Sequence, residues 1–213
     1  MNILCLNTAF NSANIAFEFE NKKYFKTIDS NCKHSENLLV EVENLFNLAK
    51  PEDVNSSEFL KMFDYIAVVV GPGSFTGLRI SISTAKAFLS TNKNLKAISI
   101  NSLELIAKES KKENKTPILN ALSGFFFVSK FENNKEVEKP KMITTEDLCS
   151  FSNYVSIEAL NFQTERVEIK PETLLELAKE KARNGNFVEE NNLLPLYIRP
   201  SQAEANFGNK KQN

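Results

Sequence analysis

One short run of residues constrains this chain most: Gly71-Pro72-Gly73-Ser74-Phe75-Thr76-Gly77-Leu78-Arg79. It holds three of the chain's six glycines. The run follows an apolar, β-branched stretch, residues 65–70, and precedes a helical pattern that reaches about Ser90. Glycine permits positive φ and close approach of two backbones. The run therefore predicts a tight strand-to-helix turn that serves either an anion or a packed neighbour.

Two generic phosphate-binding motifs do not fit the spacing of this turn. The pattern G-x-G-x-x-x-G is one residue longer than the dinucleotide fingerprint, and Leu78 and Arg79 stand where a phosphate loop has Lys and Ser or Thr. An anion can still bind at the start of the helix, because Ser74 or Thr76 can cap it and Arg79 lies near. The candidate residues of the turn are Gly71, Gly73, Ser74, Thr76, Gly77 and Arg79.

The helix after the turn carries a row of small residues. Gly77, Ser81 and Thr84 lie at helical spacing beside an apolar row that includes Leu78 and Ile82. Small side chains allow another element to approach closely. The row predicts tight packing, either within the chain or across an interface with a partner, and we interpret the glycines mainly as the close-packing start of an interface helix.

Composition excludes several classes of protein. The chain has 213 residues, 42% apolar and 25% charged, with a net charge of −1, so it lacks the basic field of a nucleic-acid binder. No apolar run is long enough to span a membrane. The three scattered cysteines are expected to be reduced thiols of a cytoplasmic protein. The single histidine, His34, excludes a multi-histidine metal site, and we predict neither a metal site nor catalytic residues.

The order of the expected elements predicts the fold class. A three-stranded meander is followed by alternating helices and strands, which gives a mixed sheet with helices on its faces. This order is the ribonuclease H-like core, which is repeated twice in the two-lobed actin, sugar-kinase and chaperone superfamily. Strands are expected at residues 3–6, 13–20, 24–28, 64–70 and 96–100, helices at 35–50, 74–90 and from 102, and a loop at 51–58.

The second half predicts a weaker, reduced repeat of this cycle. Strands are expected at 116–122, 124–131, 137–143 and 154–157, helices at 144–150 and 171–184, and a closing strand at 193–198. We therefore predict an N-terminal ribonuclease H-like lobe at 1–101, a smaller C-terminal lobe at 102–202 and a frayed polar tail at 203–213.

At the glycine run the sequence resembles the TsaB (YeaZ) family. Further segments agree with that family at lower specificity, and the resemblance is dense only over the first half. They are residues 3–9 (ILCLNTA), 34–39 (HSENLL), 99–103 (SINSL) and 196–199 (LYIR).

The resemblance implies a non-catalytic subunit of the machinery that makes N6-threonylcarbamoyladenosine beside the anticodon of tRNA. The implied partners are a catalytic TsaD-like paralogue, a small TsaE-like ATPase, a second copy of the chain when alone, and tRNA through the complex. It implies no intrinsic cofactor, and ATP or ADP with Mg²⁺ only at the junction with partner subunits. On the helices that the family uses for binding, the expected interface residues are His34, Leu38, Val42, Phe75, Leu78 and Ile82.

Two departures from the family pattern argue against independent nucleotide chemistry. Asn7 stands where the family has Asp, and Asn120-Ala121-Leu122 where it has Asp-Ala-Arg. Asn keeps an oxygen ligand but loses the charge that helps to hold Mg²⁺. A stand-alone small ATPase or kinase of the same fold remains the alternative function, together with a homodimeric interaction module. A metallopeptidase is incompatible with one histidine.

Four further features have a plain structural interpretation beside a functional one. His34 is expected to be a surface residue rather than a tRNA contact. The aromatic run 125–127 favours a core strand over a base-stacking platform. The mixed charges of 108–115 favour a solvated helix end over a tRNA contact. Glu36 and Asp64 have no neighbours at a spacing that supports proton transfer.

Overall fold

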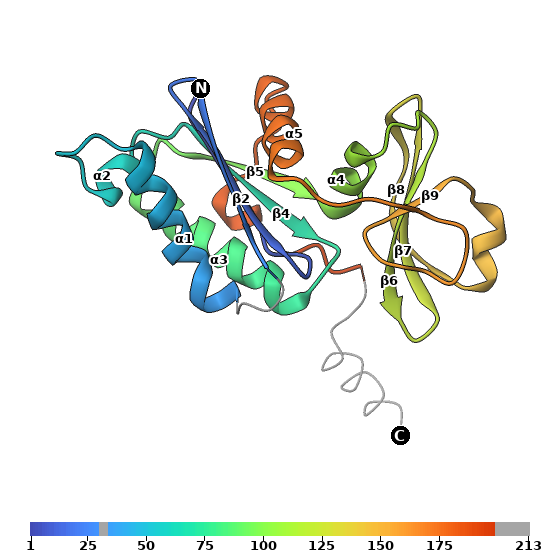
Figure 1. Ribbon diagram of the computed structural model, residues 1–213. Coiled ribbons are helices and arrows are strands. Elements are labelled where there is room, and N and C mark those ends of the chain that lie inside the picture. The colour runs from blue at the N-terminus through green and yellow to red at the C-terminus, as the bar shows by residue number, and fades with distance from the viewer. Residues whose placement is uncertain (30–33, 199–213) are drawn as a thin grey trace.

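The computed structural model describes residues 1–29 and 34–198 and contains two five-stranded sheets, one in each of two lobes (Figure 1). This confirms the predicted α/β, two-lobed fold class. The lobe boundaries near 101 and 202 stay a prediction, and the tail 203–213 lies outside the described residues.

The first sheet has the strand order β3-β2-β1-β4-β5. The meander pairs antiparallel, whereas β1 with β4 and β4 with β5 are parallel. Every residue of β1 is buried, and so is β4 after its first residue, as expected for central strands covered on both faces. The strands are β1 (Ile3–Asn7), β2 (Ala13–Phe19), β3 (Lys22–Ile28), β4 (Tyr65–Gly71) and β5 (Lys96–Asn101).

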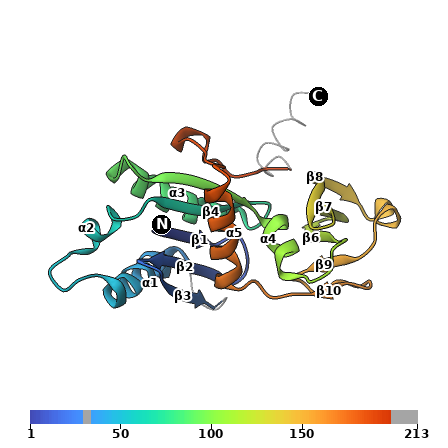
Figure 2. The ribbon, with the colours of Figure 1, turned by 90° about the horizontal axis from the view of Figure 1, so that it is seen from above.

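Helices cover both faces of this sheet. On one face α1 (His34–Ala49) packs on β2 and β3, and α3 (Phe75–Thr91) packs on β1, β4 and β5. On the other face lies α5 (Pro171–Arg183), and α4 (Ser102–Glu109) lies between the two sheets (Figure 2). Helix α5 comes from the second half of the chain, yet its buried leucines belong to the core of the first lobe.

The expectation of a loop at 51–58 is wrong for its last three residues, because a short helix begins at Ser56. Helix α2 (Ser56–Leu60) begins with a capping box, in which Asn55 Oδ1 accepts from the Glu58 N–H at 3.0 Å and Glu58 Oε2 accepts from the Asn55 N–H at 3.3 Å. The helix buries Phe59 completely, and its ring meets Phe17 edge-on. Burial of this ring fixes the segment against the core.

The second sheet has the strand order β10-β9-β6-β7-β8. The expected strands and the 3₁₀ turn η1 (Glu146–Ser150) are present, and a two-residue edge strand is added. The strands are β6 (Thr116–Leu122), β7 (Phe125–Glu132), β8 (Lys135–Thr144), β9 (Tyr154–Ser156) and β10 (Glu165–Arg166).

The closing strand predicted at 193–198 is absent from the described part of the chain. After the 3₁₀ turn η2 (Glu190–Asn192), the chain runs as an extended strap, residues 193–198, along the first lobe. Leu193 is completely buried, and the Leu196 N–H donates to Val70 O at 2.7 Å. Pro195 has no N–H to donate, which disfavours a continuous ladder. Within the described residues, no helix is long and apolar enough to cross a membrane.

Candidate partner-binding face and interlobe cleft

Two glycines of the Gly71–Arg79 turn allow it to pack directly on the loop after β1. A Cβ on Gly77 would lie 1.9 Å from Thr8 O, and one on Gly73 would lie 2.5 Å from Ala9 O. The two segments are joined by hydrogen bonds, because the Ser74 N–H donates to Ala9 O at 2.8 Å and the Thr8 hydroxyl donates to Gly77 O at 2.5 Å. For Gly77 the packing neighbour is therefore within the chain.

The first glycine of the turn serves a different neighbour. Gly71 has φ +119°, and a Cβ there would lie 3.1 Å from Leu196 O in the strap. The turn thus requires one glycine for the strap and two for the first hairpin. Ser74 caps α3 by accepting from the Gly77 N–H at 3.2 Å. Anion binding at this turn stays a prediction.

Four of the six predicted interface residues lie inside the chain's own core. Each has at most 4% of its surface exposed: Leu38, Val42, Leu78 and Ile82. They pack α1 and α3 onto the sheet, and Ser81 of the small-residue row is also completely buried. These residues therefore lie beneath the outer surface of α1 and α3. Their contact with a partner stays a prediction. His34 begins α1 and is partly buried.

The outer side of α1 presents apolar side chains that the sequence prediction did not select. Leu39 is 55% exposed, Val40 is 54% exposed and Leu48 is 74% exposed. Leu39 lies seven residues before Phe46, at helical spacing, yet Phe46 is only 3% exposed. Helical spacing alone therefore did not signal that Leu39 faces outward.

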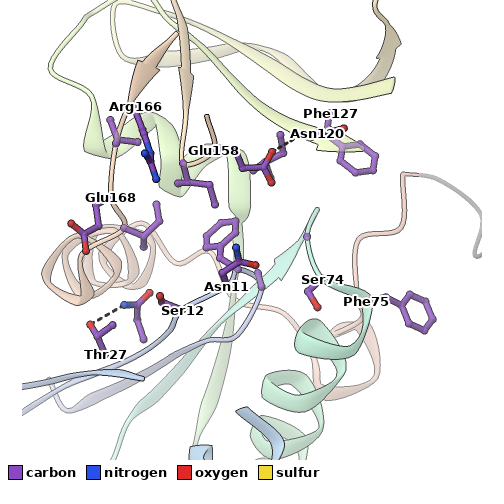
Figure 3. A pocket seen from close by; sticks show the side chains of 18 of the residues that line it. Asn11, Ser12, Thr27, Ser74, Phe75, Asn120, Phe127, Glu158, Arg166 and Glu168 are labelled. Carbon is purple, nitrogen blue, oxygen red and sulfur yellow. Dashed lines mark hydrogen bonds between the residues drawn. The ribbon is translucent and has the colours of Figure 1, made fainter. Parts of the chain in front are cut away.

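Phe75 is the predicted interface residue that reaches the surface, with 39% exposure. Its ring stacks on Tyr197 of the strap, with centroids 5.0 Å apart, and the Arg79 guanidinium carbon lies 4.0 Å from its centroid. Phe75 is also one of the residues that line the cleft between the lobes, and Figure 3 shows it at the start of α3. We define the α1–α3 face as the surface formed by Leu39, Val40, Phe75, Arg79 and Tyr197.

A cleft of about 830 Å³ separates the two lobes, with the glycine turn at its rim (Figure 3). Phe10 and Phe127 are among its apolar lining residues. Its charged side chains are Glu158, Arg166 and Glu168. None of the described lining residues is His or Cys, and the hydroxyl side chains of the lining are Ser12, Thr27 and Ser74.

The donor set in and beneath this cleft does not fit a Mg²⁺–nucleotide site. Asn7 is buried, donates to Asn14 Oδ1 at 3.0 Å and accepts from the Ala9 N–H at 3.0 Å. Asn120 Oδ1 accepts from the Leu122 N–H at 2.8 Å. Both amide oxygens thus accept from backbone donors, and the described residues contain no group of three or more His, Cys, Asp or Glu side chains that could hold a metal ion. A nucleotide at a junction with partners stays a prediction.

The structure also places the other single residues for which the sequence left a functional interpretation open. Phe126 is 8% exposed, which confirms a core strand, although Phe127 lines the cleft. Asp64 Oδ2 accepts from the Asn2 N–H at 2.7 Å. Glu36 lies in the exposed first turn of α1.

The charged segment 108–115 begins with the last two residues of α4, and its lysines pair with neighbouring elements. Lys108 Nζ lies 2.7 Å from Glu180, and Lys112 Nζ lies 3.1 Å from Glu165. Lys115 donates to Ser110 O at 2.9 Å, and burial lowers the pKa of its ammonium. The solvated helix end is therefore confirmed for Lys108, which is a surface ion-pair residue.

The cysteines that the structure describes are free thiols. Cys5 is buried in β1, where burial raises the pKa of its thiol well above the usual range, and Cys149 is exposed. Cys32 lies outside the described residues.

Comparison with known proteins gives a consistent family. The family model of TsaD, tRNA N6-adenosine threonylcarbamoyltransferase, matches residues 29–125. The tRNA threonylcarbamoyladenosine biosynthesis protein TsaB of Buchnera aphidicola subsp. Schizaphis graminum is 30% identical over 122 residues. Over these regions the chain is similar to the TsaB/YeaZ family and to TsaD. The aligned region spans 57% of this chain and only about half, 54%, of that relative.

Two solved structures share the fold over nearly the whole chain. A Pseudomonas aeruginosa protein with similarity to the peptidase YeaZ superimposes with a TM-score of 0.75 at 19% identity, covering 93% of this chain and 99% of that one. YeaZ from Pseudomonas aeruginosa gives a TM-score of 0.71 at 18% identity, covering 92% and 99%. These two likenesses establish the fold, including the second lobe.

Proposed function

We propose that this chain is an accessory subunit for the synthesis of N6-threonylcarbamoyladenosine in tRNA, and that it acts by binding a TsaD-type threonylcarbamoyltransferase. The name of the Buchnera relative supports the pathway. The TsaD family match supports the partner, because it covers residues 29–125 and hence both α1 and α3.

The α1–α3 face is the proposed binding surface, and the observation that carries the proposal is its exposed apolar content. Leu39, Val40 and Phe75 lie in the first turns of α1 and α3, which begin at the same end of the first lobe (Figure 1). Exposed apolar side chains in adjacent elements are characteristic of interaction sites.

The shared TsaD-like segment also favours a particular arrangement. A protein that resembles TsaD over 29–125 carries helices equivalent to those of its partner. Two related chains can then pair through the same face about a pseudo-twofold axis, as identical chains pair in an isologous dimer. A second copy of this chain would compete for the face.

In this proposal the chemistry resides in the partner. The amide oxygens of Asn7 and Asn120 accept hydrogen bonds from backbone donors, and none of the described lining residues of the cleft is His or Cys. A TsaE-type ATPase, with any ATP or ADP and Mg²⁺, would act at the junction of the subunits, and tRNA would be bound through the complex. We place this activity in the cytoplasm.

The test is complementation of a strain that lacks this chain, with mass spectrometry of tRNA nucleosides. Val40→Asp is expected to abolish the modified nucleoside, because a carboxylate would be buried in an apolar interface. Val137→Asp is the matched control, since Val137 is 50% exposed and Val40 is 54% exposed, but Val137 lies on β8 of the other lobe. Normal modification in the strain lacking the chain would contradict the proposed function, and equal defects in two folded variants would contradict the proposed face.

A further inference from the structure

The strap at residues 193–198 is fixed to the first lobe on both sides of Pro195. Leu193 is completely buried in the main core, and the Leu196 N–H donates to Val70 O. Gly71 leaves room for the strap, because a side chain there would lie 3.1 Å from Leu196 O. The strap therefore holds Tyr197 in a fixed position beside α3.

Tyr197, Phe75 and Arg79 form one closed group at the start of α3. The Tyr197 and Phe75 rings stack with an angle of 23° between their planes. The Arg79 guanidinium lies over the Phe75 ring, and its Nε–H donates to the Tyr197 hydroxyl oxygen at 3.1 Å. Each of the three side chains thus contacts both others, although Tyr197 lies 118 residues from Arg79 in the chain.

We propose that Tyr197 is a positioning residue for partner binding: it holds the half-exposed Phe75 ring in the orientation in which the α1–α3 face binds a TsaD-type protein. This inference rests on the proposed function. It makes the C-terminal strap a working part of a face that the sequence assigns only to the two helices.

The physical reason is the entropy of an exposed ring. Phe75 is the first residue of α3, and its ring is 39% exposed. Without Tyr197, the ring loses the stacking surface on one side and Arg79 loses a hydrogen-bond acceptor. Binding must then fix the Phe75 side chain, which the intact group already holds. Fixing a rotamer-rich side chain on binding lowers affinity by about 2- to 10-fold.

The experiment compares three variants of the full chain. Tyr197→Ala removes the ring, Tyr197→Phe keeps the ring but removes the hydroxyl acceptor, and Leu194→Ala truncates a 58% exposed residue of the same strap. The dissociation constant for the TsaD-type protein is measured by calorimetry, and the Phe75 ring is followed by NMR with labelled phenylalanine. The thermal midpoint of each variant reports on folding.

Three results are expected. Tyr197→Ala weakens binding by about 2- to 10-fold and shifts and broadens the Phe75 ring signals. Tyr197→Phe lies closer to wild type in both measurements, and Leu194→Ala matches wild type.

Two results would overturn the proposal. The first is wild-type affinity with unchanged Phe75 signals in Tyr197→Ala. The second is weakened binding with unchanged Phe75 signals, because Tyr197 would then act by direct contact alone. If wild type itself does not bind the TsaD-type protein, the proposed function is contradicted, while the Phe75 signals still decide whether Tyr197 positions the ring.

Discussion

The Gly77→Ala substitution tests the packing of the glycine turn on the first hairpin. An added Cβ would lie 1.9 Å from Thr8 O, whereas Cβ atoms essentially never approach a heavy atom within 3.0 Å. The helix and the hairpin must separate by about 1 Å, which costs about 1–3 kcal/mol as overpacking. The two hydrogen bonds between the segments contribute about 1 kcal/mol each. Alanine has a higher helix propensity than glycine, which stabilises the variant by about 1 kcal/mol. The net decrease in the free energy of unfolding is therefore about 2–4 kcal/mol.

Thermal and urea unfolding measure this loss. For a chain of this length, each 1 kcal/mol lowers the thermal midpoint by about 2–4 °C, so Gly77→Ala should lower it by about 4–16 °C. Ser83→Ala is the control, because Ser83 is exposed on the same helix and its loss should change stability by less than about 0.5 kcal/mol. An unchanged midpoint in Gly77→Ala would refute the close-packing argument.

Two further predictions concern ionisable groups. Lys179 and Glu18 form a 2.7 Å ion pair that is nearly buried, so Lys179→Met should cost about 3–5 kcal/mol in urea unfolding, and adding Glu18→Gln should restore part of it. The exposed pair of Lys108 and Glu180 should contribute less than about 1 kcal/mol, and equal losses at both pairs would contradict this reasoning. Burial raises the pKa of the Glu109 carboxyl above its ordinary 4.5, so wild-type stability falls as pH rises through the raised pKa. Glu109→Gln should therefore gain stability relative to wild type as the pH rises above the ordinary pKa of a glutamate carboxyl, and a pH-independent difference would count against it.

The first lobe could be predicted from sequence because its signals are local. The meander, the buried β4 strand and the glycine turn each follow from short patterns that the structure confirms. The capping box of Asn55 and Glu58 was an equally local signal, but the polar residues around it resembled a loop. The apolar pattern at 193–198 predicted a strand. Its residues instead serve separate purposes, with Leu193 in the core and Tyr197 against Phe75.

The binding face was harder to predict because helical spacing does not say which apolar residues of α1 contact the sheet. Leu38 and Leu39 are adjacent and equally apolar, yet one is 1% exposed and the other 55%. Leu38 is the one that packs into the core beside the sheet. The contact of Tyr197 with Phe75 joins segments more than 100 residues apart, and no local pattern in either segment signals it.

The most direct test of the account is calorimetric titration of this chain with the TsaD-type protein of the same organism. We expect a 1:1 complex that Val40→Asp disrupts and Val137→Asp leaves intact. A wild-type chain that is folded but shows no binding, or a complex indifferent to Val40→Asp, would contradict it.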